Sequence, residues 1–123
     1  NFEENYAGIS KLFDEIEKKY TGKTAGIFMP NDTHANILLN IIFKRYGKLP
    51  GKYKIIGFDD SPISKEAVIP ISTIGQQIGV MADEAMKLLV RQMDERKKRR
   101  PEPLKEPVHK VVTPVLVRRE TSV

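Results

Sequence analysis

The sequence predicts an α/β domain built around a parallel sheet, and two features of the chain support that fold class. Short continuous apolar runs at residues 25–29 and 53–57 are typical of strands buried on both faces. Amphipathic segments at helical spacing alternate with these runs, which is the pattern of parallel strands joined by crossover helices. With 123 residues, 40% of them hydrophobic and 30% charged, the chain has the balance of one soluble globular domain or a piece of one.

The first half of the chain predicts a helix, a strand and a second helix. Residues 7–20 carry apolar side chains at spacings of three and four, which indicates an amphipathic helix. The strand at residues 25–29 ends at a proline. Asn31 or Asp32 can cap the next helix, which we expect to extend to about Tyr46 and to end at the following glycine.

The second half predicts two further strands and a long helix. Residues 53–57 form a second strand, and a short turn at residues 63–67 leads to a third strand at residues 71–74. A long helix with apolar side chains at spacings of three and four begins near Gln77. We expect its methionines to fill gaps in a core rather than to form a ligand surface. These are Met81, Met86 and Met93.

The positive charge of the chain is concentrated near its C-terminal end. Lysine and arginine number 21 against 16 acidic residues, and residues 96–100 are five consecutive cations. Clustered cations can bind nucleic acid, but this run has no interleaved aromatic residues, so we expect a solvated loop. Residues 108–112 and 115–117 then close the chain as two short strands or one broken strand.

Several classes of site are excluded by composition. The chain has no cysteine, and His34 and His109 lie far apart, so neither a zinc site nor a catalytic triad is supported. The glycine-rich motifs that bind dinucleotides and nucleotide phosphates are missing. No stretch approaches the roughly 20 apolar residues of a membrane span. We therefore predict no catalytic residues, no metal and no cofactor.

Polar side chains follow three of the predicted strands. Asn31 and Asp32 follow the first strand, Asp59 and Asp60 the second, and Gln76 the third. Ligands of parallel α/β sheets bind beyond these carboxyl ends, and carboxylate and amide groups suit adjacent sugar hydroxyls. In an extended segment, consecutive aspartates point to opposite sides, so one can face a ligand while the other caps or pairs structurally. Capping and turn formation remain alternative roles for these residues, and two carboxylates in acid/base catalysis are a further alternative.

The second predicted helix carries more apolar residues than one buried stripe requires. Ile37 and Ile41 fall outside the main stripe and share their side of the helix with Asn40 and Lys44. A second buried surface is therefore expected. Either a loop of the same chain or a second subunit can cover it.

Four segments together resemble one protein family. They are residues 25–32 (AGIFMPND), 53–61 (YKIIGFDDS), 71–76 (ISTIGQ) and 113–122 (TPVLVRRETS). Their order and separation resemble the C-terminal part of the effector-binding domain of the lactose/galactose repressor family. The likeness extends over nearly the whole chain.

The resemblance implies a type I periplasmic-binding-protein-like fold of two α/β subdomains, of which this chain is roughly the last half. It implies that residues 1–76 belong to the second subdomain. Residues 77–107 then cross to the first subdomain, and residues 108–123 return as closing strands. It also implies a homodimer, whose interface agrees with the extra apolar surface at Ile37 and Ile41.

The resemblance further implies which residues contact the effector. Asn31 matches the family's ligand-binding asparagine, and Asp59 its hydroxyl-binding aspartate. Gln76 matches the polar residue after the Ser-Thr-Ile segment. Phe2 is placed at the aromatic position that stacks on the ligand ring, although its spacing to the next helix departs from the family pattern.

The predicted function is the ligand-sensing and dimerising portion of a cytoplasmic bacterial transcriptional regulator. It would bind a small sugar and control operator DNA through a DNA-binding head outside this chain. A periplasmic-type sugar-binding protein with the same fold is the alternative, and a small hydrolase and direct nucleic-acid binding are weaker ones. We expect no enzymatic activity and no membrane contact, and we expect the isolated chain to self-associate because a half-domain exposes apolar surface.

Overall fold

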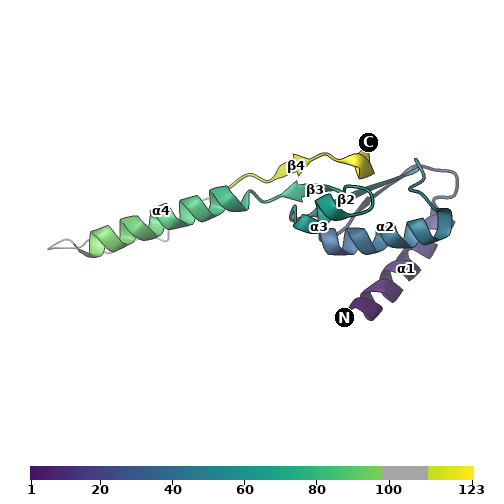
Figure 1. Ribbon diagram of the computed structural model, residues 1–123, viewed down its shortest axis with the longest axis horizontal. Coiled ribbons are helices and arrows are strands. Elements are labelled where there is room, and N and C mark those ends of the chain that lie inside the picture. The colour runs from purple at the N-terminus through teal and green to yellow at the C-terminus, as the bar shows by residue number, and fades with distance from the viewer. Residues whose placement is uncertain (98–110) are drawn as a thin grey trace. The chain divides into compact units, whose positions relative to one another are not determined.

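The computed structural model describes residues 1–97 and 111–123 (Figure 1). The chain divides into two compact units. Unit 1 consists of residues 1–75 and 116–123, and unit 2 of residues 76–115. The predicted loop at residues 96–100 and strand at residues 108–112 lie largely outside the described residues.

A four-stranded sheet forms the centre of unit 1. Its strands are β1 (Ala25–Phe28), β2 (Tyr53–Phe58), β3 (Ser72–Gly75) and β4 (Val115–Val117), and they lie in that order across the sheet. β1 pairs with β2 in parallel, with Ile27 opposite Ile55, and β2 pairs with β3 in parallel, with Ile56 opposite Ser72. The predicted parallel α/β sheet is confirmed. Its parallel register brings the ends of these strands to one edge.

Helix α1 (Phe2–Lys19) begins five residues earlier than predicted. The Asn1 side chain accepts a hydrogen bond from the Glu4 backbone N–H at 2.8 Å, and the Glu4 side chain reaches back to the N-terminal amine. This capping box satisfies backbone donors that would otherwise be unpaired, which explains why the helix begins at Phe2. Phe2 consequently lies in the first turn of α1.

Helix α2 (Asp32–Tyr46) has the predicted bounds, with Asn31 as its N-cap and Gly47 at φ 69° as its C-cap. Its buried apolar residues pack with α1 and the strands in one core. The largest fully buried apolar side chains of that core are Phe13, Leu38, Leu39, Ile42, Ile55 and Ile71.

The surface predicted at Ile37 and Ile41 as a subunit interface is buried inside unit 1 instead. Both side chains belong to the core that includes Ile9 and Phe13 of α1, so a helix of the same unit covers them. From sequence, a second apolar face shows only that something covers it. The identity of the covering element depends on tertiary packing. The interface assignment of Ile37 and Ile41 is therefore wrong.

Two short elements close unit 1. Helix α3 (Pro62–Glu66) follows β2, and the 3-10 turn η1 (Glu120–Ser122) lies against β2 and β3. The buried Thr121 hydroxyl donates to the Ile55 carbonyl at 2.7 Å and accepts from the Ser72 N–H at 2.8 Å. The last residues of the chain are thereby fixed to the middle of the sheet.

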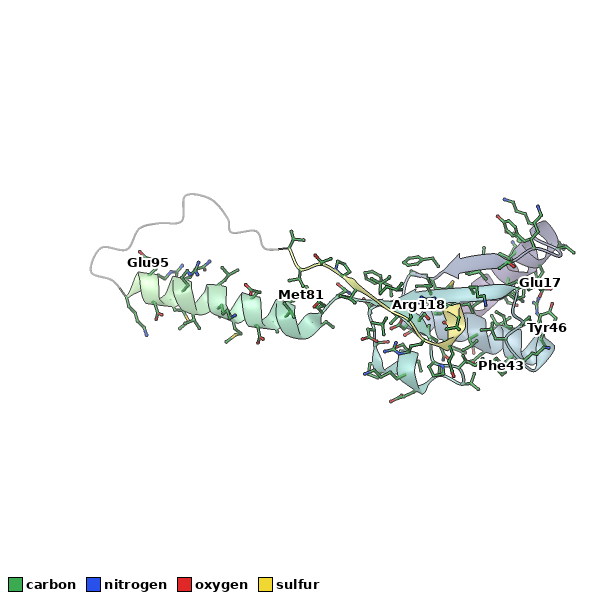
Figure 2. The ribbon with its side chains drawn as sticks, turned by 90° about the horizontal axis from the view of Figure 1, so that it is seen from above. Glu17, Phe43, Tyr46, Met81, Glu95 and Arg118 are labelled. Atoms are coloured by element: carbon green, nitrogen blue, oxygen red, sulfur yellow. The ribbon has the colours of Figure 1, made fainter. Side chains whose placement is uncertain are left out.

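Unit 2 contains helix α4 (Ile78–Arg96), none of whose residues is buried. Figure 2 shows Met81 and Glu95 near its two ends. Within the described residues the methionines of α4 do not lie in a core: Met86, for example, is 58% exposed. Their predicted core role stays a prediction. The helical spacing was a correct signal for a helix, but the residues that the structure describes do not cover it. No helix in the described part of the chain is long and apolar enough to cross a membrane.

Candidate functional site

The candidate site of unit 1 lies where β1 and β2 end. Phe28 pairs with Ile56, so these parallel strands finish side by side and deliver Asn31 and Asp59 to the same edge. The Asn31 carboxamide oxygen accepts a hydrogen bond from the His34 N–H at 2.8 Å, which caps α2. Asn31 therefore has the structural role that the sequence left open. It remains half-buried at the edge where a ligand role was expected.

Asp32 is the central buried polar group of this edge, and its side chain was missed as a functional residue. It is 1% exposed and accepts three hydrogen bonds. The Ser61 N–H donates at 2.7 Å and the Ser61 hydroxyl at 3.1 Å, while the Thr73 hydroxyl donates at 2.6 Å. A buried carboxylate is tolerated when it is hydrogen-bonded in this way. Asp32 thus joins α2 to the loop after β2 and to β3.

Gly57 makes room for that carboxylate. A Cβ atom at Gly57 would collide with Asp32 Oδ1 and lie 3.2 Å from the Asp32 Cα. Glycine at this position of β2 permits the close approach of α2. The glycine of the YKIIGFDDS segment therefore has a steric function in forming the site.

The two aspartates after β2 have left-handed backbone conformations. The φ angle is 104° at Asp59 and 53° at Asp60. The sequence interpretation assumed an extended segment with side chains on opposite sides, and that geometry is wrong. Non-glycine residues with such angles are uncommon and are found where the surrounding structure holds them, often at functional sites.

Hydrogen bonds to β3 hold this turn. The Asp59 N–H donates to the Ile74 carbonyl at 2.9 Å, and the Asp60 N–H donates to the Thr73 hydroxyl oxygen at 3.3 Å. Thr73 in turn donates to Asp32. The backbone that carries Asp59 is therefore connected to the buried carboxylate through one threonine.

Asp60 forms an ion pair with Arg119, at 2.8 Å between Oδ1 and Nη2. The structural pairing that the sequence allowed for one of the two aspartates is thus found at Asp60. Arg119 was not predicted to take part in the site. It lies 59 positions away in the sequence, so no local pattern could have indicated the contact.

Gln76 directly follows β3 in the chain, whereas Phe2 lies on α1. Gln76 is the first residue of unit 2 and is half-buried. Phe2 is mostly exposed on α1, with its ring centroid 6.0 Å from that of Tyr6. The effector-binding assignments of Asn31, Asp59, Gln76 and Phe2 stay predictions.

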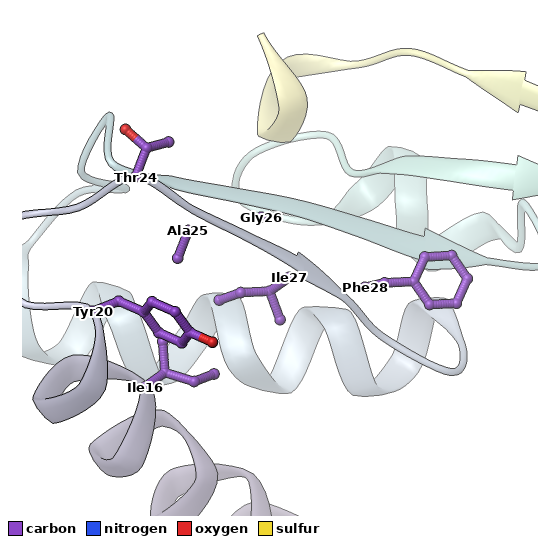
Figure 3. A pocket seen from close by; sticks show the side chains of 7 residues that line it. All are labelled: Ile16, Tyr20, Thr24, Ala25, Gly26, Ile27 and Phe28. Atoms are coloured by element: carbon purple, nitrogen blue, oxygen red, sulfur yellow. The ribbon is translucent and has the colours of Figure 1, made fainter.

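A separate cavity of about 380 Å³ lies along β1 (Figure 3). Ile16 and Tyr20 of α1 and residues 24–28 line it. It has no carboxylate or amide side chain to pair with sugar hydroxyls, so it does not match the predicted ligand chemistry. Among the described residues, no group of three histidine or acidic side chains could hold a metal ion.

Comparison with known protein families identifies the fold. A model of the periplasmic binding protein-like domain matches residues 2–122. The chain belongs to this family. The resemblance derived from the four sequence segments is thereby confirmed at the level of the periplasmic binding protein-like domain.

Solved structures of regulators have the same fold. The lac repressor dimer bound to operator and the anti-inducer ONPF matches with a TM-score of 0.69 and 16% identity, covering 97% of this chain and 37% of that chain. A LacI family transcriptional regulator from Enterococcus faecium with bound ribose matches with a TM-score of 0.69 and 24% identity, covering 96% of this chain and 39% of that one.

A ribose operon repressor of Bacillus subtilis (strain 168) is similar in sequence. It is 39% identical over 67 residues, which is 54% of this chain and 21% of the repressor. The periplasmic binding protein-like chain therefore spans about a fifth of that relative and less than half of each regulator structure.

Proposed function

We propose that this chain is the C-terminal, effector-sensing part of a LacI-type transcriptional regulator that responds to a small sugar in the cytoplasm. The observation that carries the proposal is the edge of the sheet where two parallel strands end at Asn31 and Asp59. The buried Asp32 carboxylate stabilises this edge by accepting hydrogen bonds from Ser61 and Thr73. The ribose operon repressor of Bacillus subtilis supports a pentose, and we take ribose as the first ligand to test.

The sugar would act by selecting one conformation of the regulator. A carboxylate accepts hydrogen bonds from sugar hydroxyls, whereas an amide can both accept and donate, so Asp59 and Asn31 would fix the orientation of the sugar. Gln76 and Phe2 complete the proposed set of contacts. A ligand that binds one closure state more tightly shifts the population toward it, and a DNA-binding head elsewhere in the regulator would respond to that shift.

The proposed regulator is a homodimer that binds operator DNA through a separate segment. Asn40 and Lys44 are exposed on α2 and remain proposed contacts of the dimer, whereas the buried Ile37 and Ile41 are not. Lys44 already lies over the Tyr6 ring of α1, with Nζ 5.4 Å from the ring centroid. Any dimer contact at this position would therefore include the surface of α1.

The exposed apolar face of α4 supports a larger protein. A helix that is apolar over much of its circumference is normally buried. We propose that the first effector subdomain of the regulator covers this helix, as the resemblance implies for residues 77–107. The isolated chain would then associate through the uncovered face.

The proposal is tested by titrating ribose into the full-length protein and into its Asp59→Ala variant. We expect the variant to bind ribose about 100-fold more weakly, because two charge-assisted hydrogen bonds are lost at about 1.5 kcal/mol or more each. Calorimetry gives the sugar affinity, and operator binding is measured on the same samples. Operator affinity and dimer formation should persist.

Asp14→Ala is the matched control, since it removes an exposed carboxylate of α1 that pairs with Arg45. It should leave ribose binding unchanged. Equal ribose affinity of wild type and Asp59→Ala contradicts the site. Binding of ribose with no affinity for operator DNA would favour a solute-binding protein instead.

A further inference from the structure

The turn that carries Asp59 is fixed through its neighbour, Asp60. Two consecutive non-glycine residues in the left-handed region are rarely stable without external support. Asp60 receives that support at both its backbone and its side chain. The backbone N–H reaches Thr73, and the carboxylate reaches Arg119.

Arg119 forms several hydrogen bonds in addition to its ion pair with Asp60. Its backbone N–H donates to the Ser72 hydroxyl oxygen at 2.7 Å, and the Ser72 hydroxyl lies 3.1 Å from the Arg119 carbonyl. Its Nη1 atom donates to the Ser64 hydroxyl oxygen and to the Ile71 carbonyl, both at 3.0 Å. The Arg119 side chain is only 14% exposed.

These contacts make Arg119 a rigid support rather than a surface charge. A guanidinium group fixes several acceptors in one plane, which a flexible ammonium group does not do. Nη2 is then available to Asp60 at 2.8 Å.

We propose that Arg119 is a positioning residue for effector binding, which acts through Asp60 to hold the Asp59 backbone in its binding conformation. The inference rests on the proposed function. It assigns the final segment of the chain a role in ligand affinity although Arg119 does not itself contact the sugar.

The test measures ribose affinity in the full-length protein with Arg119→Gln and Asp60→Asn. Each change removes one charge of the pair, and asparagine still tolerates the left-handed backbone. We expect each variant to bind ribose at least 10-fold more weakly. Arg119→Lys, which keeps the charge, should recover part of the loss. Arg118→Gln is the matched control, since Arg118 is exposed, and it should bind as the wild type does.

A double variant separates positioning from general destabilisation. In an Asp59→Asn background we expect ribose binding to be weaker but still measurable, and adding Arg119→Gln should weaken it less than twofold further. A full additional 10-fold loss would overturn the inference, because Arg119 would then act independently of Asp59. If Arg119→Gln does not fold, Asp60→Asn in the same background gives the same comparison.

The two proposals fail differently. If wild type and Asp59→Ala show the same response to ribose, the proposed function fails. If Asp59→Ala loses ribose binding while Arg119→Gln and Asp60→Asn bind as the wild type does, the proposed function stands and the positioning role of Arg119 is overturned.

Discussion

The two units of the chain contain helices with similar sequence periodicity and opposite degrees of burial. In unit 1, Leu38, Leu39 and Ile42 of α2 are almost completely inaccessible to solvent. In unit 2, most apolar residues of α4 are exposed, and Ile78 and Leu89 each show more than half of their surface. Both helices place apolar side chains at spacings of three and four.

The difference shows that periodicity specifies a helix but not its burial. The α2 stripe meets strands on one side and α1 on another, so apolar area is removed from water. The described residues do not supply such a partner for α4. Unit 1 therefore contains its own source of stability. Because most helical stability comes from tertiary packing, we expect α4 to be the less stable helix unless another subdomain covers it, as proposed above.

The comparison is tested most strongly by shortening one leucine in each helix. Leu39 is 0% exposed, so Leu39→Ala should lower the free energy of unfolding of this chain by about 3–4 kcal/mol through lost burial and a cavity. Leu89 is 51% exposed, so Leu89→Ala should cost under about 1 kcal/mol. Urea denaturation followed by circular dichroism measures both, at a protein concentration low enough to keep the chain monomeric.

The same pair in the full-length protein sharpens the comparison. If another subdomain covers α4, the cost of Leu89→Ala should rise toward the value for a buried leucine, about 2–5 kcal/mol. Equal costs for the two leucines in the isolated chain would contradict the contrast between the units.

Sequence periodicity predicted the strands and α2 well, because these features depend on local patterns. The α1 start was missed because the capping box at Asn1 and Glu4 lies ahead of the first apolar residues. The cover over Ile37 and Ile41 was assigned to a second subunit because the sequence does not show where α1 packs. Local signals therefore locate elements, whereas their partners depend on tertiary structure.

The candidate site was predictable only in part for the same reason. The position of Asn31 and Asp59 follows from where the strands end. The supporting contacts do not: Asp32 binds Ser61 and Thr73 over 29 and 41 positions of sequence. A buried carboxylate between distant hydroxyl groups has no local sequence signature.

The next test compares glycine positions in the two units. Gly57→Ala in β2 should destabilise unit 1 by about 1–3 kcal/mol, because the new methyl group displaces the Asp32 carboxylate. A Cβ atom at Gly79 of α4 meets nothing within 4 Å, so Gly79→Ala should increase helicity slightly through its better helix propensity. Thermal unfolding and far-ultraviolet circular dichroism measure the two effects.

Gly26→Ala in the neighbouring strand is the matched control for Gly57→Ala. A Cβ atom at Gly26 has open space around it, so this change should leave the free energy of unfolding nearly unaffected. A loss at Gly26 as large as that at Gly57 would mean that strand backbone, and not the Asp32 contact, determines the effect.

The contrast extends to the surface of the units. In unit 1, Glu17 of α1 accepts a hydrogen bond from the Tyr46 hydroxyl of α2 at 2.6 Å (Figure 2). Its Oε1 atom also lies 3.2 Å from Nη1 of Arg45. In unit 2, Lys87 and Glu84 pair within one helix at 4.0 Å. Contacts between helices restrain tertiary structure, whereas a pair within one helix supports only that helix.

The smallest effect we expect is a pH dependence of the contact between α1 and α2. The hydrogen bond to Glu17 raises the pKa of Tyr46 to about 12 from its ordinary value of 10.0. Because folding favours the protonated phenol, this contribution is complete below pH 10 and is lost as the pH rises through 12. At pH 8, Tyr46→Phe should therefore have a lower free energy of unfolding in urea than the wild type. This difference should disappear at high pH. Tyrosinate absorbance should show the Tyr46 pKa falling toward 10.0 in Glu17→Gln, and an unchanged titration would mean that Glu17 does not hold the phenol.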